Sequence, residues 1–172
     1  MRIAACLLLC LAALAAAGMA AARADHEAVY AEQLMADPEL ARADYLEQCA
    51  GCHGVEGRSA PAQLPELRGR VGWFMCTPAS RAYLLRLPNI AHSRLTDNAR
   101  LADLMNYAVF VLGAGSVPPG TPSFTSDEVA RERPRALTSV ALTAERARYV
   151  REAIRKCRAP DSLKQLYPGQ AR

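Results

Sequence analysis

The residues best placed to do chemistry are the Cys-x-x-Cys-His motif formed by Cys49, Cys52 and His53. Two thiols at this spacing can add across the two vinyl groups of one haem, and the next residue is then held under the iron as its proximal ligand. A redox disulfide would need a preceding strand in a βαβ setting, whereas residues 38–48 look helical. A zinc site would need a second ligand pair at matching spacing, and the sequence has none. The motif therefore predicts one covalently attached haem c.

The N-terminus has the layout of a secretory signal peptide. Arg2 precedes the apolar residues 3–22, and Ala22-Arg23-Ala24 offers small residues at a cleavage site. This pattern predicts cleavage after Ala24. An uncleaved anchor is the alternative, since the apolar run is nearly long enough to span a membrane. Haem is attached covalently outside the bacterial cytoplasm, so we expect a periplasmic protein that meets the membrane only if the signal is uncleaved.

Removal of the signal leaves 148 residues, which suits one domain. The full chain has 21 basic and 17 acidic residues, and loss of Arg2 and Arg23 leaves a net charge of +2. Two haem propionates would neutralise this charge, and nothing in the balance indicates nucleic-acid binding. Cys76 and Cys157 are the two cysteines left over in an oxidising compartment, which predicts a disulfide between them. Two buried free thiols are the alternative.

Capping residues and hydrophobic periodicity predict helices throughout and no strand. An Asp-Pro or Thr-Pro pair starts two of them, and apolar residues at i, i+3, i+4 and i+7 mark a third. Loops are expected at residues 59–72, 87–94 and 116–123. The expected helices lead from residue 38 into the haem motif, from 77 to the proline at 88, from 96 or 97 to the glycine at 113, from 126 to about 134, and from 143 to 157.

Over residues 38–112 the chain resembles the class I c-type cytochromes. In that family a small residue stands eight positions before the first haem cysteine and an aromatic residue four before it, which are Ala41 and Tyr45 here. The last core helix of the family carries a leucine and an aromatic residue three apart, matched by Leu104 and Tyr107. The resemblance implies an all-α, cytochrome c-like domain around one haem. It also places Tyr45 among the cofactor-binding residues.

A second match lies in the loop after the haem motif. Residues 65–69, Pro-Glu-Leu-Arg-Gly, resemble the family's P-x-L-x-G loop, at the expected distance from His53. In the family, the carbonyl of this proline accepts the ring N–H of the proximal histidine that does not face the iron. The resemblance therefore implies that Pro65 fixes the tautomer of His53 and makes it more basic. An ordinary proline loop is the alternative.

The sixth iron ligand is where the sequence departs from the family. The loop before the last core helix usually supplies a methionine, but residues 87–94 contain none and offer His92 instead. Met75, further upstream, is the alternative ligand. A thioether ligand raises the reduction potential and a second imidazole gives a lower one. A third alternative is an open sixth position, which would leave the iron accessible to small ligands.

These features predict a periplasmic carrier of single electrons rather than an enzyme, because no nucleophile with its base is visible. The alternative is a haem-based binder or sensor of small ligands with an open or weakly ligated distal site. Expected partners are a periplasmic dehydrogenase, whose cytochrome subunit this chain could be, or a terminal oxidase. The predicted organisation is a signal peptide (residues 1–24), a cytochrome c domain (25–115) and a helical C-terminal extension packed on the haem domain (116–172).

The C-terminal extension is rich in arginine, and two interpretations of this remain open. Clustered cations can form a docking face for an acidic partner. Interleaved glutamates favour an ordinary solvated helix face instead. The arginines are Arg131, Arg133, Arg135, Arg146, Arg148, Arg151, Arg155 and Arg158.

Overall fold

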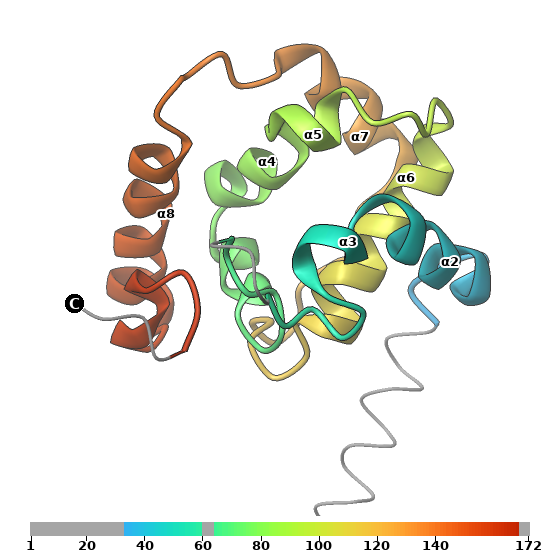
Figure 1. Ribbon diagram of the computed structural model, residues 1–172. Helices are drawn as coiled ribbons and strands as arrows, with labels where there is room; N and C mark the ends of the chain where they lie inside the picture. Colours follow the sequence, from blue (N-terminus) through green and yellow to red (C-terminus); the bar gives the residue numbers. More distant parts are fainter. Residues whose placement is uncertain (1–32, 60–63, 169–172) are drawn as a thin grey trace, which may run out of the picture.

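The computed structural model describes residues 33–59 and 64–168, and within these ranges the chain is helical with no β-strand (Figure 1). The predicted all-α fold class is therefore confirmed. The expected signal peptide and its cleavage after Ala24 lie outside the described residues. No helix in the described ranges is long and apolar enough to cross a membrane. The α-helices are α2 Pro38–Gln48, α3 Ala50–His53, α4 Pro78–Arg86, α5 Pro88–Ala91, α6 Asn98–Asn106, α7 Ser126–Glu132 and α8 Leu142–Cys157.

Side-chain caps explain why three helices begin where the sequence predicts. The Asp37 carboxylate accepts a hydrogen bond from the Leu40 amide at the start of α2. Thr77 and Ser80 form a reciprocal capping box at the start of α4. The Asp97 carboxylate accepts from the first amides of α6. Each cap satisfies backbone donors that have no partner inside the helix, so these boundaries follow from local chemistry.

Four short elements complete the described part of the fold. Periodicity predicts helix at the one that continues α6, though not its π geometry, and does not reveal the other three. Segment η1 (Val71–Cys76) is a 3₁₀-helix, as are η3 (Arg133–Arg135) and η4 (Asp161–Lys164). Segment η2 (Tyr107–Leu112) continues α6 as a π-helix. The short 3₁₀ turns give no repeating apolar pattern in a sequence. The loop expected at residues 87–94 likewise contains one helical turn, α5.

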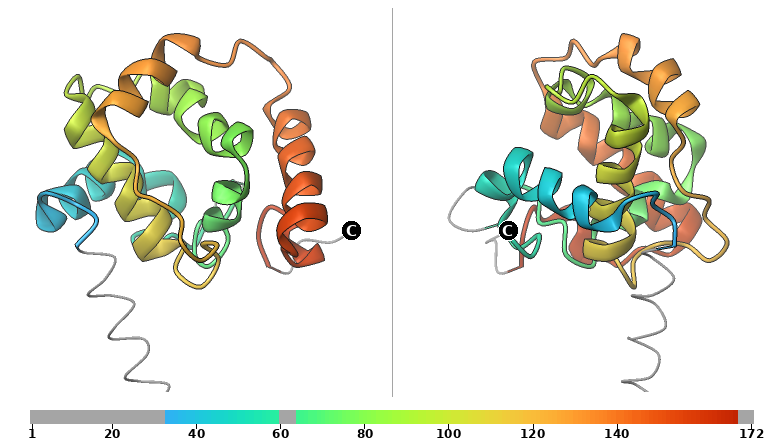
Figure 2. Two further views of the ribbon diagram at one scale, coloured as in Figure 1. Left: turned by 180° about the vertical axis from the view of Figure 1, so that it is seen from behind. Right: turned by 90° about the vertical axis from the view of Figure 1, so that its right-hand side faces the viewer.

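The N-terminal half of the fold is built on the crossing of α2 over α6 and η2 (Figure 2). Ala41 and Tyr45 of α2 are fully buried at this crossing. The ring of Tyr45 packs on that of Tyr107, with 5.5 Å between the ring centroids. A small side chain at residue 41 lets the two helices approach closely. The crossing therefore fixes where the end of α2, and the haem motif that follows it, can lie.

The C-terminal extension packs through α8 on η1 (Figure 1). Tyr149 and Val150 of α8 are buried, and the Tyr149 ring lies 4.6 Å, centroid to centroid, from that of Tyr83 in α4. The predicted disulfide between Cys76 and Cys157 is confirmed, and it joins the end of η1 to the end of α8. The buried edge of α8 consists of Arg146, Tyr149, Val150 and Ala153.

We predict that replacing Cys76 and Cys157 together by serine lowers the free energy of unfolding by about 2–4 kcal/mol. The cross-link joins residues separated by 81 positions, so its loss restores much chain entropy to the unfolded state. Urea unfolding of the haem-loaded protein measures the difference. Reduced wild-type protein, alkylated at these two thiols, is the control and should lose a similar amount. Equal stability of the variant and oxidised wild type would contradict the prediction.

Candidate haem-attachment site

The haem motif forms one helical turn directly after α2. The amides of Cys52 and His53 both donate to the carbonyl of Cys49, at 3.1 and 2.9 Å. Residues three apart on such a turn project from the same side, so both thiols face one neighbouring volume. Cys49 is half-buried and Cys52 is exposed, and the two thiols are not bonded to each other. The turn thus presents two separate sulfur atoms, as addition to two vinyl groups requires.

The environment of Cys49 differs from that of a redox-active cysteine. Burial, and then the neighbouring Cys52, raises the pKa of the Cys49 thiol to about 11. The thiol is therefore protonated at neutral pH. Disulfide oxidoreductases work through a stabilised thiolate with a lowered pKa. The environment thus disfavours the redox-disulfide interpretation of the motif.

His53 is held in the tautomer that an iron ligand needs. Its Nδ1 lies 3.1 Å from the carbonyl oxygen of Pro65. A carbonyl can only accept, so Nδ1 carries the proton and Nε2 keeps a free lone pair. Burial lowers the pKa of His53, an effect partly offset by the bond to Pro65, so the ring is neutral at neutral pH. Neutral imidazole with a free Nε2 is the form that binds haem iron.

The turn after His53 is fixed from both sides. The fully buried Tyr45 donates its hydroxyl to the carbonyl of Gly54, at 2.7 Å. Gly54 has φ +76°, and a Cβ placed there would overlap the carbonyl oxygen of Arg58. Burial raises the pKa of Tyr45 to about 12, so its hydroxyl stays a donor. Tyr45 therefore acts on the site as a core aromatic that holds the backbone beside the histidine.

The loop that carries Pro65 is tied to the haem motif through backbone bonds. The amides of Leu67 and Arg68 both donate to the carbonyl of Gly57, at 2.9 and 3.0 Å. The amide of Gly69 donates to Leu112 at the end of η2. Cys49 and the Leu67 side chain pack against both hydrophobic clusters of the core. The motif and its supporting loop thus lie where the two clusters meet, next to apolar surface that would surround a haem.

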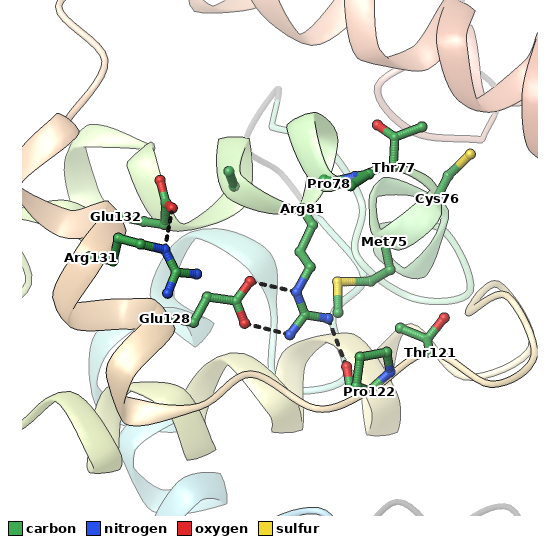
Figure 3. Close-up of a pocket in the computed structure, with 11 residues that line it drawn as sticks. Met75, Cys76, Thr77, Pro78, Arg81, Thr121, Pro122, Glu128, Arg131 and Glu132 are labelled. Carbon is green, nitrogen blue, oxygen red and sulfur yellow. Dashed lines mark hydrogen bonds and ion pairs between the residues drawn. The ribbon is translucent and has the colours of Figure 1, made fainter.

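Met75 is buried and lines a cavity of about 340 Å³ formed with α4, α7 and residues 121–122. In Figure 3 its thioether points toward the guanidinium of Arg81. Arg81 makes two 2.6 Å bonds to Glu128 and one of 2.7 Å to the carbonyl of Pro122. No residue of the haem motif lines this cavity. Met75 as an iron ligand stays a prediction.

His92 is exposed and follows the last residue of α5. Its turn is held by Arg133 of the C-terminal extension, whose guanidinium bonds the carbonyls of Ala91 and Ser93 on either side of it. The same guanidinium reaches the side chain of Asn98 at 3.1 Å. The sequence gives no sign of this role, because backbone carbonyls carry no residue signature. His92 as the distal ligand also stays a prediction.

Sequence comparison finds two similar proteins, both named cytochrome c-552 and both from Thermus thermophilus. The first is 26% identical over 147 residues, covering 75% of this chain and 88% of its own. The second is 26% identical over 117 residues, covering 58% of this chain and 88% of its own. No protein-family model matches the chain, and no solved structure matches it.

The similarity and the site agree at a coarse level. Both relatives are named as cytochromes c, which agrees with the haem-attachment chemistry that the motif predicts. The donor set fits a covalently held haem, since Cys49 and Cys52 are unpaired thiols and His53 has a free Nε2.

We predict that Gly54→Ala lowers the free energy of unfolding by about 1–3 kcal/mol, because it forces a left-handed backbone on a residue with a Cβ. Gly51→Ala is the matched control, since a Cβ at residue 51 meets nothing within 4 Å. It should leave the stability unchanged or raise it slightly. Chemical unfolding of both variants provides the measurement, and equal effects of the two would refute this view of the turn.

Proposed function

We propose that this chain is an exported, class I, monohaem c-type cytochrome that carries single electrons in the periplasm. The observation that carries the proposal is the tautomer of His53. Its Nδ1–H donates a hydrogen bond to the carbonyl of Pro65, which leaves Nε2 free. Two unpaired thiols on the same helical turn complete the arrangement. A redox disulfide would not need a histidine held in this state.

Each residue of the motif has a distinct part in holding the cofactor. Haem c, when bound, supplies a reversible one-electron couple between ferric and ferrous iron. The thiols of Cys49 and Cys52 would bind it as two thioethers, each sulfur bonding one vinyl carbon while the thiol hydrogen goes to the other. His53 would ligate the iron through Nε2. The carbonyl of Pro65 makes this imidazole more basic, which favours the ferric state and lowers the reduction potential.

Electron exchange is proposed at the surface beside Cys52. This cysteine is exposed, so a haem edge bonded to it would lie close to solvent. Val55, two residues beyond the motif, is 60% exposed and adds an apolar contact point. The nearby ion pair of Glu56 and Arg58 gives the rim both signs of charge. A periplasmic dehydrogenase as donor, or a terminal oxidase as acceptor, is the proposed partner at this edge.

We expect one haem per chain to remain with the polypeptide after acid–acetone extraction of protein produced with a c-type haem maturation system. Cys49→Ser combined with Cys52→Ser should release the haem, because both thioether bonds are lost. The matched control combines Cys76→Ser with Cys157→Ser, which removes the same number of sulfurs and should keep the haem attached. Haem extracted from wild type, or two haems per chain, would overturn the proposal.

His92 is the proposed distal ligand. Its backbone position is fixed by the bonds from Arg133 to both neighbouring carbonyls, as a ligand-bearing turn requires. Its ring is exposed at the end of α5. Met75 is the weaker candidate, because its thioether lines a cavity without residues of the haem motif. An open sixth position corresponds to the alternative function of a small-ligand binder or sensor.

We predict that the ferric protein is low-spin without the near-infrared band of sulfur ligation, and that His92→Ala makes it high-spin. Met75→Leu is the control and should leave the spectrum unchanged, because it keeps the buried volume while removing the thioether. Absorption and electron paramagnetic resonance spectra distinguish the outcomes. An unchanged His92→Ala spectrum would remove His92 as ligand. A high-spin wild type that binds carbon monoxide in its ferrous state would favour the sensor.

A further inference from the structure

Residues 160–166, close to the end of the described chain, double back beside α8 and are here named the strap (Figure 1). The reversal takes place at Arg158, which adopts a left-handed conformation with φ 58°. Leu163 anchors the strap, since its side chain is only 1% exposed within the main core cluster. The strap is therefore a packed element of the fold.

Two arginines bind the strap through its backbone. Arg70, at the start of η1, donates to the carbonyls of Ser162 and Gln165, at 2.7 and 2.6 Å. Arg146 of α8 is buried and donates to the carbonyls of Leu163 and Gln165, at 3.1 and 3.5 Å. A charged guanidinium group is a strong hydrogen-bond donor, and its bonds to carbonyl oxygens offset part of the free-energy cost of burying the charge. Four bonds thus fix the course of the strap.

The strap ends on the peptide unit that supports the proximal histidine. The amide of Glu66 donates to the carbonyl of Leu166, at 2.7 Å. That amide and the Pro65 carbonyl, which accepts from His53, belong to one peptide group. A peptide group is planar and its two ends are conjugated, so holding the N–H fixes the direction of the carbonyl. Donation by the N–H also makes the carbonyl oxygen a better acceptor.

We propose that the strap positions the proximal ligand, with the Leu166 carbonyl orienting and polarising the Pro65–Glu66 peptide group against His53. This inference rests on the proposed function, because it concerns the ligand of a haem that the motif would hold. A better acceptor at Nδ1 makes the imidazole more basic and stabilises ferric iron. Loss of the bond between Leu166 and Glu66 therefore raises the reduction potential.

Glu66→Pro tests this directly, because proline has no amide hydrogen to give to Leu166. Glu66→Gln is the matched control, since it removes the same charge and keeps the amide. Relative to Glu66→Gln, the proline variant should favour ferrous over ferric iron by about twofold to fivefold, which corresponds to part of one hydrogen bond. The reduction potential and the NMR resonance of the His53 Nδ1 proton are the two readouts.

Leu163→Ala is a second variant, which loosens the strap at its anchor without changing any charge. It should shift the potential in the same direction, whereas a merely structural role would lower stability and leave the potential unchanged. Arg151→Met, on the exposed face of α8, is the control for a remote change and should shift neither readout.

The outcomes separate the two proposals. Absence of covalent haem in wild type would contradict the proposed function. Attached haem with equal potentials in Glu66→Pro and Glu66→Gln would overturn the role of the strap, as would a downward shift. If Glu66→Pro does not fold, Leu163→Ala decides the question by the direction of its potential.

Discussion

The structure around the haem motif depends on one hydrogen bond, from Nδ1 of His53 to the carbonyl of Pro65. This bond selects the tautomer of the histidine and joins two segments that the sequence separates by a loop. To form it, the chain must bring the Pro65 loop against the turn that carries both thiols. The bonds of that loop to Gly57 and Leu112, and the contact of Tyr45 with Gly54, all maintain this juxtaposition. The crossing of α2 over α6 and η2 in turn places Tyr45.

The sequence reveals those parts of the site that depend on residue type. Cysteine and histidine have chemistries that few other residues share, so the haem motif can be recognised from residue type and spacing. The Pro65 loop is recognised only through the resemblance to the class I c-type cytochromes. Helix starts at Asp37, Thr77 and Asp97 are equally visible, because caps need particular side chains. The disulfide follows from the number of cysteines that remain after export, and the structure contains it. Fold class and these elements were therefore predictable.

Apart from the helix caps and the Pro65 carbonyl, which the family resemblance implies, contacts to the backbone were not predictable, because every residue has a carbonyl and most have an amide. The support of the His92 turn by Arg133 depends on the carbonyls of Ala91 and Ser93, whose side chains play no part. The bond between Glu66 and Leu166 is likewise independent of both side chains. The sequence also did not show which way the side chain of Met75 points. Met75 lies in a short 3₁₀-helix, which lacks the periodicity that assigns residues to a buried face.

These contacts show that some arginines of the C-terminal extension have a structural role. Arg133 and Arg146 direct their guanidinium groups at backbone carbonyls inside the molecule, and so are unavailable as a docking surface. On the outer face of α8, Arg148 pairs with Glu145 and Lys156 with Glu152, and Arg151, Arg155 and Arg158 are exposed beside these pairs. Exposed pairs of this kind produce little long-range attraction at physiological salt. The inward-facing arginines thus support the His92 turn and the strap beside the Pro65 loop, and the surface beside Cys52 is the proposed point of contact with a redox partner.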